Sequence, residues 1–253
     1  MATSAPILAT RNLGLDIGGA KIVADVTLEV RAGELVGIIG PNGAGKTTLF
    51  NLLSGLMRPT WGRIELGGRD VTDDPVHKRT QAGLGRTFQI SSVFPLLPVL
   101  ENVRLAVEAS RGGALRIWRR ASSLGEAIER AQWALGRVGL GDREAVTAGS
   151  LPHGDKRKLE LAMLLAADKD VILLDEPMAG VSAGDVPGLV DVIRAVHKED
   201  GKTVLMVEHH IGVVTGLADR IAVMHHGALL AIDTPQRVME NAQVQEAYLG
   251  EPL

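Results

Sequence analysis

The chain has 253 residues, a formal net charge of −3 and no cysteine. The missing thiols exclude disulfides, thiolate zinc sites and cysteine nucleophiles, and the negative charge disfavours nucleic acid as the main partner. No stretch free of Asp, Glu, Lys and Arg is long enough to span a bilayer. Glycine is abundant at 30 residues, beside only three Phe, three Trp and one Tyr, which suits a protein that binds phosphate through its main chain.

The first half of the chain alternates strands with one helix and then becomes helical. Apolar and polar residues alternate over 26–30, which predicts a surface strand, and the apolar run 35–39 predicts a buried one. A helix is expected over 47–56 and a strand over 62–68. From residue 99 to 138, apolar residues recur at spacings of three and four, so a helical block is expected there.

After residue 151 the alternation of strands and helices resumes. Apolar runs predict three buried strands, at 171–174, 203–207 and 221–224. Helices are expected over 158–166 and around 186–196. Uninterrupted apolar strands separated by helices are typical of a parallel sheet that is covered on both faces.

A glycine-rich segment lies between the first buried strand and the first predicted helix. It satisfies the phosphate-loop pattern G-x-x-x-x-G-K-[ST]. In such a loop, backbone N–H groups wrap the phosphates, the lysine reaches the β and γ oxygens, and the Thr47 hydroxyl ligates Mg²⁺. We therefore assign nucleotide binding to Gly40, Pro41, Asn42, Gly43, Ala44, Gly45, Lys46, Thr47 and Thr48.

Two carboxylates end the buried strand at 171–174, where α/β sheets bind ligands. Asp175 is placed to hold Mg²⁺, and Glu176 to polarise the water that attacks the γ-phosphate. His209 follows the strand at 203–207, which should lie beside the acid-bearing strand, so its ring is expected to hydrogen-bond the γ-phosphate. These residues predict hydrolysis of the bound nucleotide.

Together, these segments resemble the ATP-binding subunits of ABC transporters over nearly the whole chain. Residues 40–47 match the Walker A motif, residues 171–176 Walker B, His209 the H-loop histidine and Gln89 the Q-loop glutamine. The resemblance implies an α/β fold: an ABC-type P-loop ATPase with a mainly parallel RecA-like core sheet, an N-terminal antiparallel β subdomain and an inserted helical subdomain. It also implies that ATP and Mg²⁺ are the cofactors and that Gln89 touches the metal or the attacking water.

The resemblance divides a single ABC ATPase domain, 1–253, into parts. Residues 1–92 and 155–232 are expected to form the nucleotide-binding core with its β subdomain. Residues 93–154 would form the helical subdomain, which ends in the signature motif, and residues 233–253 a C-terminal helical extension.

The signature motif departs from the usual Leu-Ser-Gly-Gly-Gln of the family. In the family it acts in trans: each ATP in a head-to-tail dimer is bound by one chain's P-loop and the other chain's signature. Here Pro152 replaces the serine and supplies neither a hydroxyl nor an N–H, so a weaker contact is expected. The residues at this position are Leu151, Pro152, His153, Gly154 and Asp155.

The position that aligns with the family's adenine-stacking aromatic is also unusual. Ile17 stands there, and no Phe, Trp or Tyr precedes Phe50. The adenine is therefore expected to pack on an aliphatic side chain, without the stacking energy that an aromatic ring provides.

Finer features resemble the branched-chain amino acid importer subfamily: residues 85–89, 176–181 and 246–251, although the ending is also similar to ATPases of lipopolysaccharide export. The resemblance implies an ATPase that powers import through separate integral-membrane permease subunits. It further implies a second ATPase subunit, identical or related, and a periplasmic or extracellular solute-binding protein. The chain would then be cytoplasmic and peripheral on the inner face of the cell membrane.

Other functions remain open at this point. The transporter could import urea, amides or aromatic acids, or export lipopolysaccharide, and a soluble ABC ATPase without a transport role is a further alternative. A GTPase is disfavoured because the chain has no Asn-Lys-x-Asp guanine motif. A small-molecule kinase is also disfavoured, because such kinases lack the combination of signature-like motif, acid pair and switch histidine that this chain has.

Overall fold

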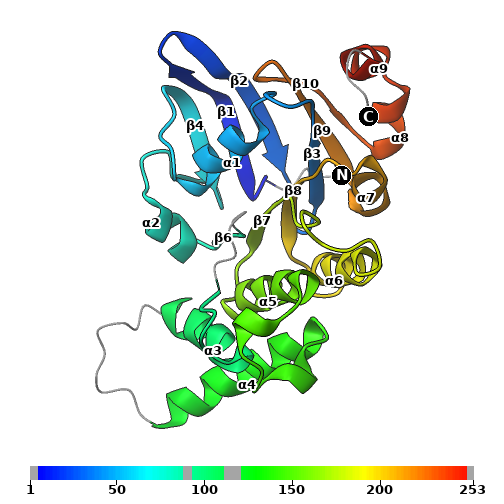
Figure 1. The fold of residues 1–253 in the computed structure, drawn as a ribbon. Coiled ribbons are helices and arrows are strands. Elements are labelled where there is room, and N and C mark those ends of the chain that lie inside the picture. Colours follow the sequence, from blue (N-terminus) through cyan, green and yellow to red (C-terminus); the bar gives the residue numbers. More distant parts are fainter. Residues whose placement is uncertain (1–4, 88–92, 111–120, 250–253) are drawn as a thin grey trace.

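The computed structural model describes residues 5–87, 93–110 and 121–249. Two sheets occupy one end of the molecule, and a group of helices lies at the other end (Figure 1). The predicted phosphate loop and the predicted acid pair lie where β3 and β7 of the larger sheet end.

The smaller sheet is antiparallel, with the strand order β2-β1-β4-β5. The alternation over 26–30 belongs to the end of β2, and the strand predicted over 62–68 is β4. The sequence pattern does not predict β1, because register shifts at Leu13 and Leu15 interrupt its alternation. The bounds are β1 (Leu8–Ile17), β2 (Ala20–Val30), β4 (Trp61–Leu66) and β5 (Arg69–Asp70).

The larger sheet has the order β10-β9-β3-β8-β7-β6. Among the described strands of this sheet, β10 pairs with β9 antiparallel and the other neighbours pair in parallel, so the predicted mainly parallel core sheet is confirmed. Its strands are β3 (Leu35–Ile39), β6 (Leu84–Arg86), β7 (Val171–Asp175), β8 (Thr203–Val207), β9 (Arg220–His225) and β10 (Ala228–Asp233).

Both faces of the larger sheet are buried, which explains its uninterrupted apolar runs. Along β7, Leu173 packs into a core shared with α1 (Lys46–Ser54) and the antiparallel sheet, whereas Ile172 packs into a second core on the other face. The second core includes α5 (His153–Ala166) and α6 (Val186–Lys198). Because the strands are fixed between two cores, the loops at their ends are held in defined positions.

The helical block consists of α3 (Val99–Ser110) and α4 (Ala121–Arg137), which pack against each other and against α5. Helix α5 begins at His153, five residues before the predicted start at residue 158. Pro152 stands at its N-cap with a non-helical ψ of 158°, and Asp155 lies in the first turn, where a negative charge favours the helix. Three further helices are short: α2 (Val76–Gln81), α7 (Ile211–Leu217) and α8 (Pro235–Glu240).

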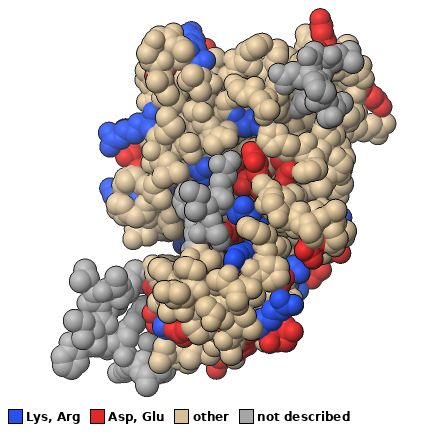
Figure 2. Space-filling model, viewed as in Figure 1, with Lys and Arg blue, Asp and Glu red and all other residues tan. Residues whose placement is uncertain are grey.

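The last described helix is α9 (Ala242–Leu249), which packs near β10 and α8. Within the described ranges, no helix combines the length and apolar character needed to cross a membrane. Charged side chains of both signs gather at the middle of the molecule, between the sheets and the helical block (Figure 2).

Candidate functional site

The predicted phosphate loop connects β3 to α1, and its backbone presses against neighbouring strands. Gly40 and Gly45 have φ angles of 156° and 94°. A Cβ on Gly40 would lie 2.2 Å from the carbonyl oxygen of Met224, and a Cβ on Gly45 would lie 2.7 Å from that of Ile22. Only glycine fits both positions, so the loop conformation depends on them.

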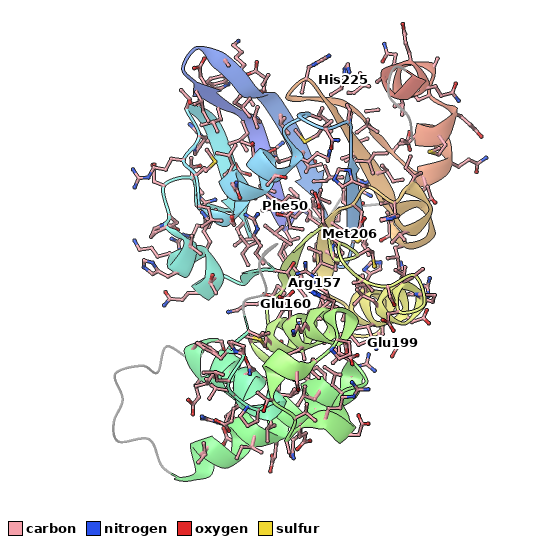
Figure 3. All side chains as sticks on the ribbon, in the orientation of Figure 1. Phe50, Arg157, Glu160, Glu199, Met206 and His225 are labelled. Atoms are coloured by element: carbon pink, nitrogen blue, oxygen red, sulfur yellow. The ribbon has the colours of Figure 1, made fainter. Side chains whose placement is uncertain are left out.

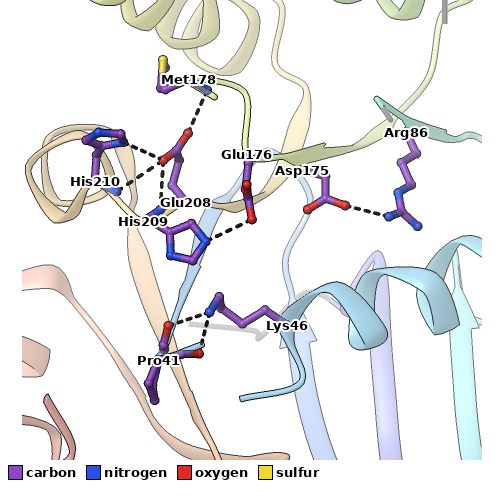
Figure 4. Close-up of polar contacts among 10 residues, drawn as sticks. Pro41, Lys46, Arg86, Asp175, Glu176, Met178, Glu208, His209 and His210 are labelled. Carbon is purple, nitrogen blue, oxygen red and sulfur yellow. Dashed lines mark hydrogen bonds and ion pairs between the residues drawn. The ribbon is translucent and has the colours of Figure 1, made fainter. Parts of the chain in front are cut away.

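Lys46 opens α1 and folds back over its own loop (Figure 4). Its Nζ donates hydrogen bonds to the carbonyl oxygens of Gly40, at 2.6 Å, and Pro41, at 2.9 Å, and only 6% of the residue is exposed. Phosphate oxygens are stronger acceptors for an ammonium group than carbonyls. The lysine is therefore held beside the loop at the position where a polyphosphate would meet it, next to the exposed Thr47.

Asp175 ends β7 and is 1% exposed. Its Oδ2 accepts a hydrogen bond of 2.7 Å from Arg86, whereas Oδ1 is buried and has no hydrogen-bond partner among the described residues. Burial raises the pKa of this carboxyl, although the Arg86 hydrogen bond and charge oppose the rise. An orphaned carboxylate oxygen facing the same space as Lys46 (Figure 4) fits a hard cation such as Mg²⁺.

Glu176 and His209, predicted from separate parts of the sequence, are brought together. His209 Nε2 lies 3.0 Å from Glu176 Oε1. The Glu176 backbone has a φ of 49°, in the left-handed region, and its N–H donates to Val207 on β8 at 2.9 Å. Such a conformation costs about 1–3 kcal/mol in a residue with a side chain, and strain of this kind concentrates at functional sites.

Glu208 is a residue of this site that sequence reasoning missed. It is 2% exposed, and its carboxylate accepts the N–H groups of Met178, at 2.8 Å, and of His209, at 2.9 Å. The backbone N–H of His210 also donates to it, at 3.3 Å. Glu208 thus ties the loop after β7 to the loop after β8. The available signal was an acid placed directly after a buried strand, as Asp175 is.

The signature residues surround the start of α5. Leu151 is buried, whereas Pro152 and His153 are exposed. Gly154 packs against Asp185, because a Cβ on Gly154 would lie 3.2 Å from the Asp185 Cβ. Asp155, which replaces the usual glutamine, forms an ion pair with Arg143 and lies 3.6 Å from Lys158. The trans role of these residues stays a prediction.

Two further predicted residues, Ile17 and Gln89, stay predictions. Ile17 ends β1 before the Gly18-Gly19 turn and is 53% exposed. Its exposure leaves room for a base, and its assignment to adenine binding stays a prediction. Gln89 lies outside the described residues.

These features define an α/β P-loop nucleotide-binding protein. The glycine loop, its lysine, the acid pair and the histidine converge on one edge of a mainly parallel sheet (Figure 4). Residues 23–179 match the family model described as ABC transporter. The chain therefore belongs to the ABC transporter family, as an ATP-binding cassette. Residues 228–252 match a second model, described as Branched-chain amino acid ATP-binding cassette transporter.

Curated relatives align over nearly the entire chain. LivG of Escherichia coli K12, a high-affinity branched-chain amino acid transport ATP-binding protein, is 37% identical over 98% of this chain and 99% of its own length. BraF of Pseudomonas aeruginosa, with the same description, is 36% identical over the same shares. LptB of Haemophilus influenzae, a lipopolysaccharide export system ATP-binding protein, is 36% identical over 97% of this chain and 98% of LptB.

Solved structures agree with the family assignment. The ADP conformation of MJ1267, an ATP-binding cassette of an ABC transporter, superposes with a TM-score of 0.84 at 27% identity, over 98% of this chain and all of that one. A dimeric post-hydrolysis state of the cassette MJ0796, bound to ADP and Pi, gives a TM-score of 0.76 at 26% identity, over 90% and 98%. The predicted ABC-type P-loop fold is confirmed.

Proposed function

We propose that this chain is the ATP-hydrolysing subunit of a transporter that imports branched-chain amino acids. The names of LivG and BraF support the substrate class, as does the match of residues 228–252 to the branched-chain cassette model. The main support for ATP hydrolysis is the distance of 3.0 Å between His209 Nε2 and Glu176 Oε1. Both residues lie on the same edge of the sheet as Lys46 and Asp175.

The residues divide the work of phosphoryl transfer among them. The P-loop amides and Lys46 bind and orient the phosphates. Thr47 and Asp175, with Gln89, would hold Mg²⁺, which supplies positive charge that neutralises the phosphate oxygens. Glu176 accepts a proton from the attacking water, and His209 holds the Glu176 carboxylate in place and reaches toward the γ-phosphate.

The proposed transport function requires partner subunits. We infer integral-membrane permease subunits, a second ATPase subunit and a solute-binding protein, with this chain cytoplasmic on the inner face of the membrane. A mainly apolar cleft of about 280 Å³ between the core and the helical block supports a permease contact. A permease segment bound in this cleft would be moved when ATP binding moves the helical block. The apolar lining of the cleft includes Val76, Leu84, Ala106, Met163 and Leu164.

The substitution Glu176→Gln tests the hydrolytic assignment. The variant should bind ATP with unchanged affinity but lose nearly all turnover, because a positioned general base contributes roughly 10²- to 10⁴-fold. Phosphate release and ATP binding are measured side by side, with Glu240→Gln on α8 as the control. Normal hydrolysis in Glu176→Gln would refute the role of Glu176.

Uptake measurements test the transported substrate. Vesicles that contain the chain together with its permease subunits and binding protein should accumulate labelled leucine, isoleucine or valine only when ATP is supplied on the side of the membrane where the ATPase lies. Uptake of urea, amides or aromatic acids instead, or ATP-dependent extraction of lipopolysaccharide, would replace the branched-chain assignment with that alternative.

A further inference from the structure

Arg86, the last residue of β6, connects Asp175 to the helix that follows the phosphate loop. Its side chain is 7% exposed. Nη2 donates to Asp175 Oδ2 at 2.7 Å, and Nη1 donates to Asn51 Oδ1 and Ser54 Oγ on α1, both at 2.8 Å. The guanidinium carbon lies 5.8 Å from the centre of the Phe50 ring, which packs beneath it.

The neighbouring residue holds Asp175 by its backbone. The Asp175 N–H donates to Thr87 Oγ1 at 3.3 Å, and the Thr87 N–H donates to Leu173 on β7 at 3.0 Å. The end of β6 therefore fixes both the main chain and one carboxylate oxygen of Asp175. The second oxygen, Oδ1, is left buried without a hydrogen-bond partner in the described part of the chain.

We propose, on the basis of the proposed ATPase function, that Arg86 is a positioning residue for the metal of the bound nucleotide. By holding Oδ2, Arg86 fixes the rotation of the Asp175 carboxylate so that Oδ1 is presented to Mg²⁺. Because the same guanidinium bonds α1, it also sets the distance between Asp175 and the helix that carries Thr47. Partners of this kind, one step removed from the metal, orient ligands and tune metal affinity.

The charged surroundings of Asp175 extend to α5. Arg157 lies close enough to favour the ionised carboxylate, and its Nη1 donates to Glu160 at 2.9 Å. Figure 3 shows Arg157 and Glu160 on α5, on the side that faces the core sheet. Arg157 is therefore a second positive charge near Asp175, but Arg86 is the one bonded to the carboxylate.

A lysine could not reproduce this geometry. The planar guanidinium presents two nitrogens at fixed spacing, one to Asp175 and the other to α1, whereas an ammonium group is a single point charge on a flexible stem. Arg86→Lys should therefore keep a charge beside Asp175 but lose the fixed link to α1. The Mg²⁺ concentration that it needs for half-maximal enhancement of ATP binding should fall between those of the wild type and Arg86→Gln.

The test measures nucleotide binding by the full-length chain, with excess EDTA and across a Mg²⁺ titration. In Arg86→Gln, ATP affinity in EDTA should stay within about twofold of wild type, since the hydrogen bonds of Arg86 given above go to Asp175 and to α1. The Mg²⁺ concentration needed for half-maximal enhancement of ATP binding should rise roughly 10- to 100-fold. In an Asp175→Asn background, Arg86→Gln should add no further change in Mg²⁺ dependence.

Arg220→Gln is the matched control for a purely structural effect. Arg220 is also a partly buried arginine of the same sheet; it contacts Glu34 at 2.5 Å and the Glu29 carbonyl at 2.6 Å. This variant should lower the melting temperature without moving the Mg²⁺ midpoint. An unchanged midpoint in Arg86→Gln, or an equal loss of ATP affinity in EDTA, would overturn the proposal, whereas wild-type protein that fails to bind ATP would instead refute the proposed function.

Discussion

Asp175 carries a charge that its surroundings compensate only in part. Burial raises its pKa, Glu176 adds to the rise, and Arg86 and Arg157 oppose it. The folded state therefore binds a proton at this carboxyl more tightly than the unfolded chain does, so its ionisation at neutral pH costs stability. Functional acids are often maintained at such a cost, because the charged form is needed for ligand binding.

The raised pKa predicts an early loss of metal binding on acidification. Only the ionised carboxylate ligates Mg²⁺, so the Mg²⁺ enhancement of ATP binding should weaken at a higher pH than an ordinary aspartate, with a pKa of about 3.9, would allow. Mg²⁺ titrations at a series of pH values check this. Asp175→Asn is measured in parallel because it lacks the carboxyl, so its pH dependence reports the protonation of ATP alone. A wild-type pH dependence identical to that of Asp175→Asn would contradict the prediction.

Lys46→Ala should remove most of the affinity for ATP. Charge-assisted hydrogen bonds are worth about 1.5–3 kcal/mol each, so the loss of one phosphate contact corresponds to roughly 10- to 100-fold weaker binding. Titration with a fluorescent ATP analogue measures the effect, and Lys78→Ala, an exposed lysine on α2, serves as the control. Unchanged affinity in Lys46→Ala would show that the phosphate loop is misassigned.

At the scale of elements, the site depends on two loops that leave adjacent parallel strands. The loop after β7 carries Glu176 and Met178, and the loop after β8 carries His209. Glu208 joins the two loops because its carboxylate accepts the backbone N–H groups of Met178, 30 residues away in sequence, and of His209, the next residue. The contact between His209 and Glu176 is thus supported by a buried carboxylate that touches neither of their side chains.

Glu208→Gln should loosen both loops at once. A glutamine has one acceptor oxygen, and its amide N–H groups would face N–H donors, so at least one backbone donor loses its partner at a cost of about 1–3 kcal/mol. We expect a lower free energy of unfolding in urea and a lower turnover number, with ATP affinity largely kept. Glu240→Gln is the control, and turnover equal to wild type would show that the loops hold their positions without Glu208.

At the scale of the whole molecule, the exposed start of α5 lies far in sequence from the phosphate loop of the same chain. In the proposed dimer, the start of α5 would contact the ATP that is bound to the partner chain. Pro152 stands at the N-cap of α5, where no side chain caps the helix. The cassette MJ0796 is dimeric in a post-hydrolysis state bound to ADP and Pi.

Pro152→Ser should strengthen ATP-dependent dimerisation and raise the ATPase activity of the assembled dimer. A serine at this position supplies a hydroxyl and an N–H toward the phosphate, and it also caps α5, which is worth about 1 kcal/mol. Sedimentation with ATP and steady-state hydrolysis measure the two effects. Pro152→Ala is the control because it removes the ring without adding a hydroxyl, and equal behaviour of the two variants would mean that backbone donors suffice.

The sequence by itself determined the parts of this protein that depend on neighbouring residues. The pattern of residues 40–47 identified the phosphate loop, and apolar runs identified the buried strands, because each strand is covered on both faces. The acids at the end of β7 were predicted because the end of a buried strand is a local feature of the sequence.

Only the tertiary structure decided which distant residues support the predicted site. Arg86 and Asp175 are 89 residues apart, and they meet because β6 pairs in parallel with β7 at the edge of the sheet. Glu208 reaches Met178 because β8 lies on the other side of β7. These hydrogen bonds depend on the packing of the whole chain around two cores, so they became visible only in the folded protein.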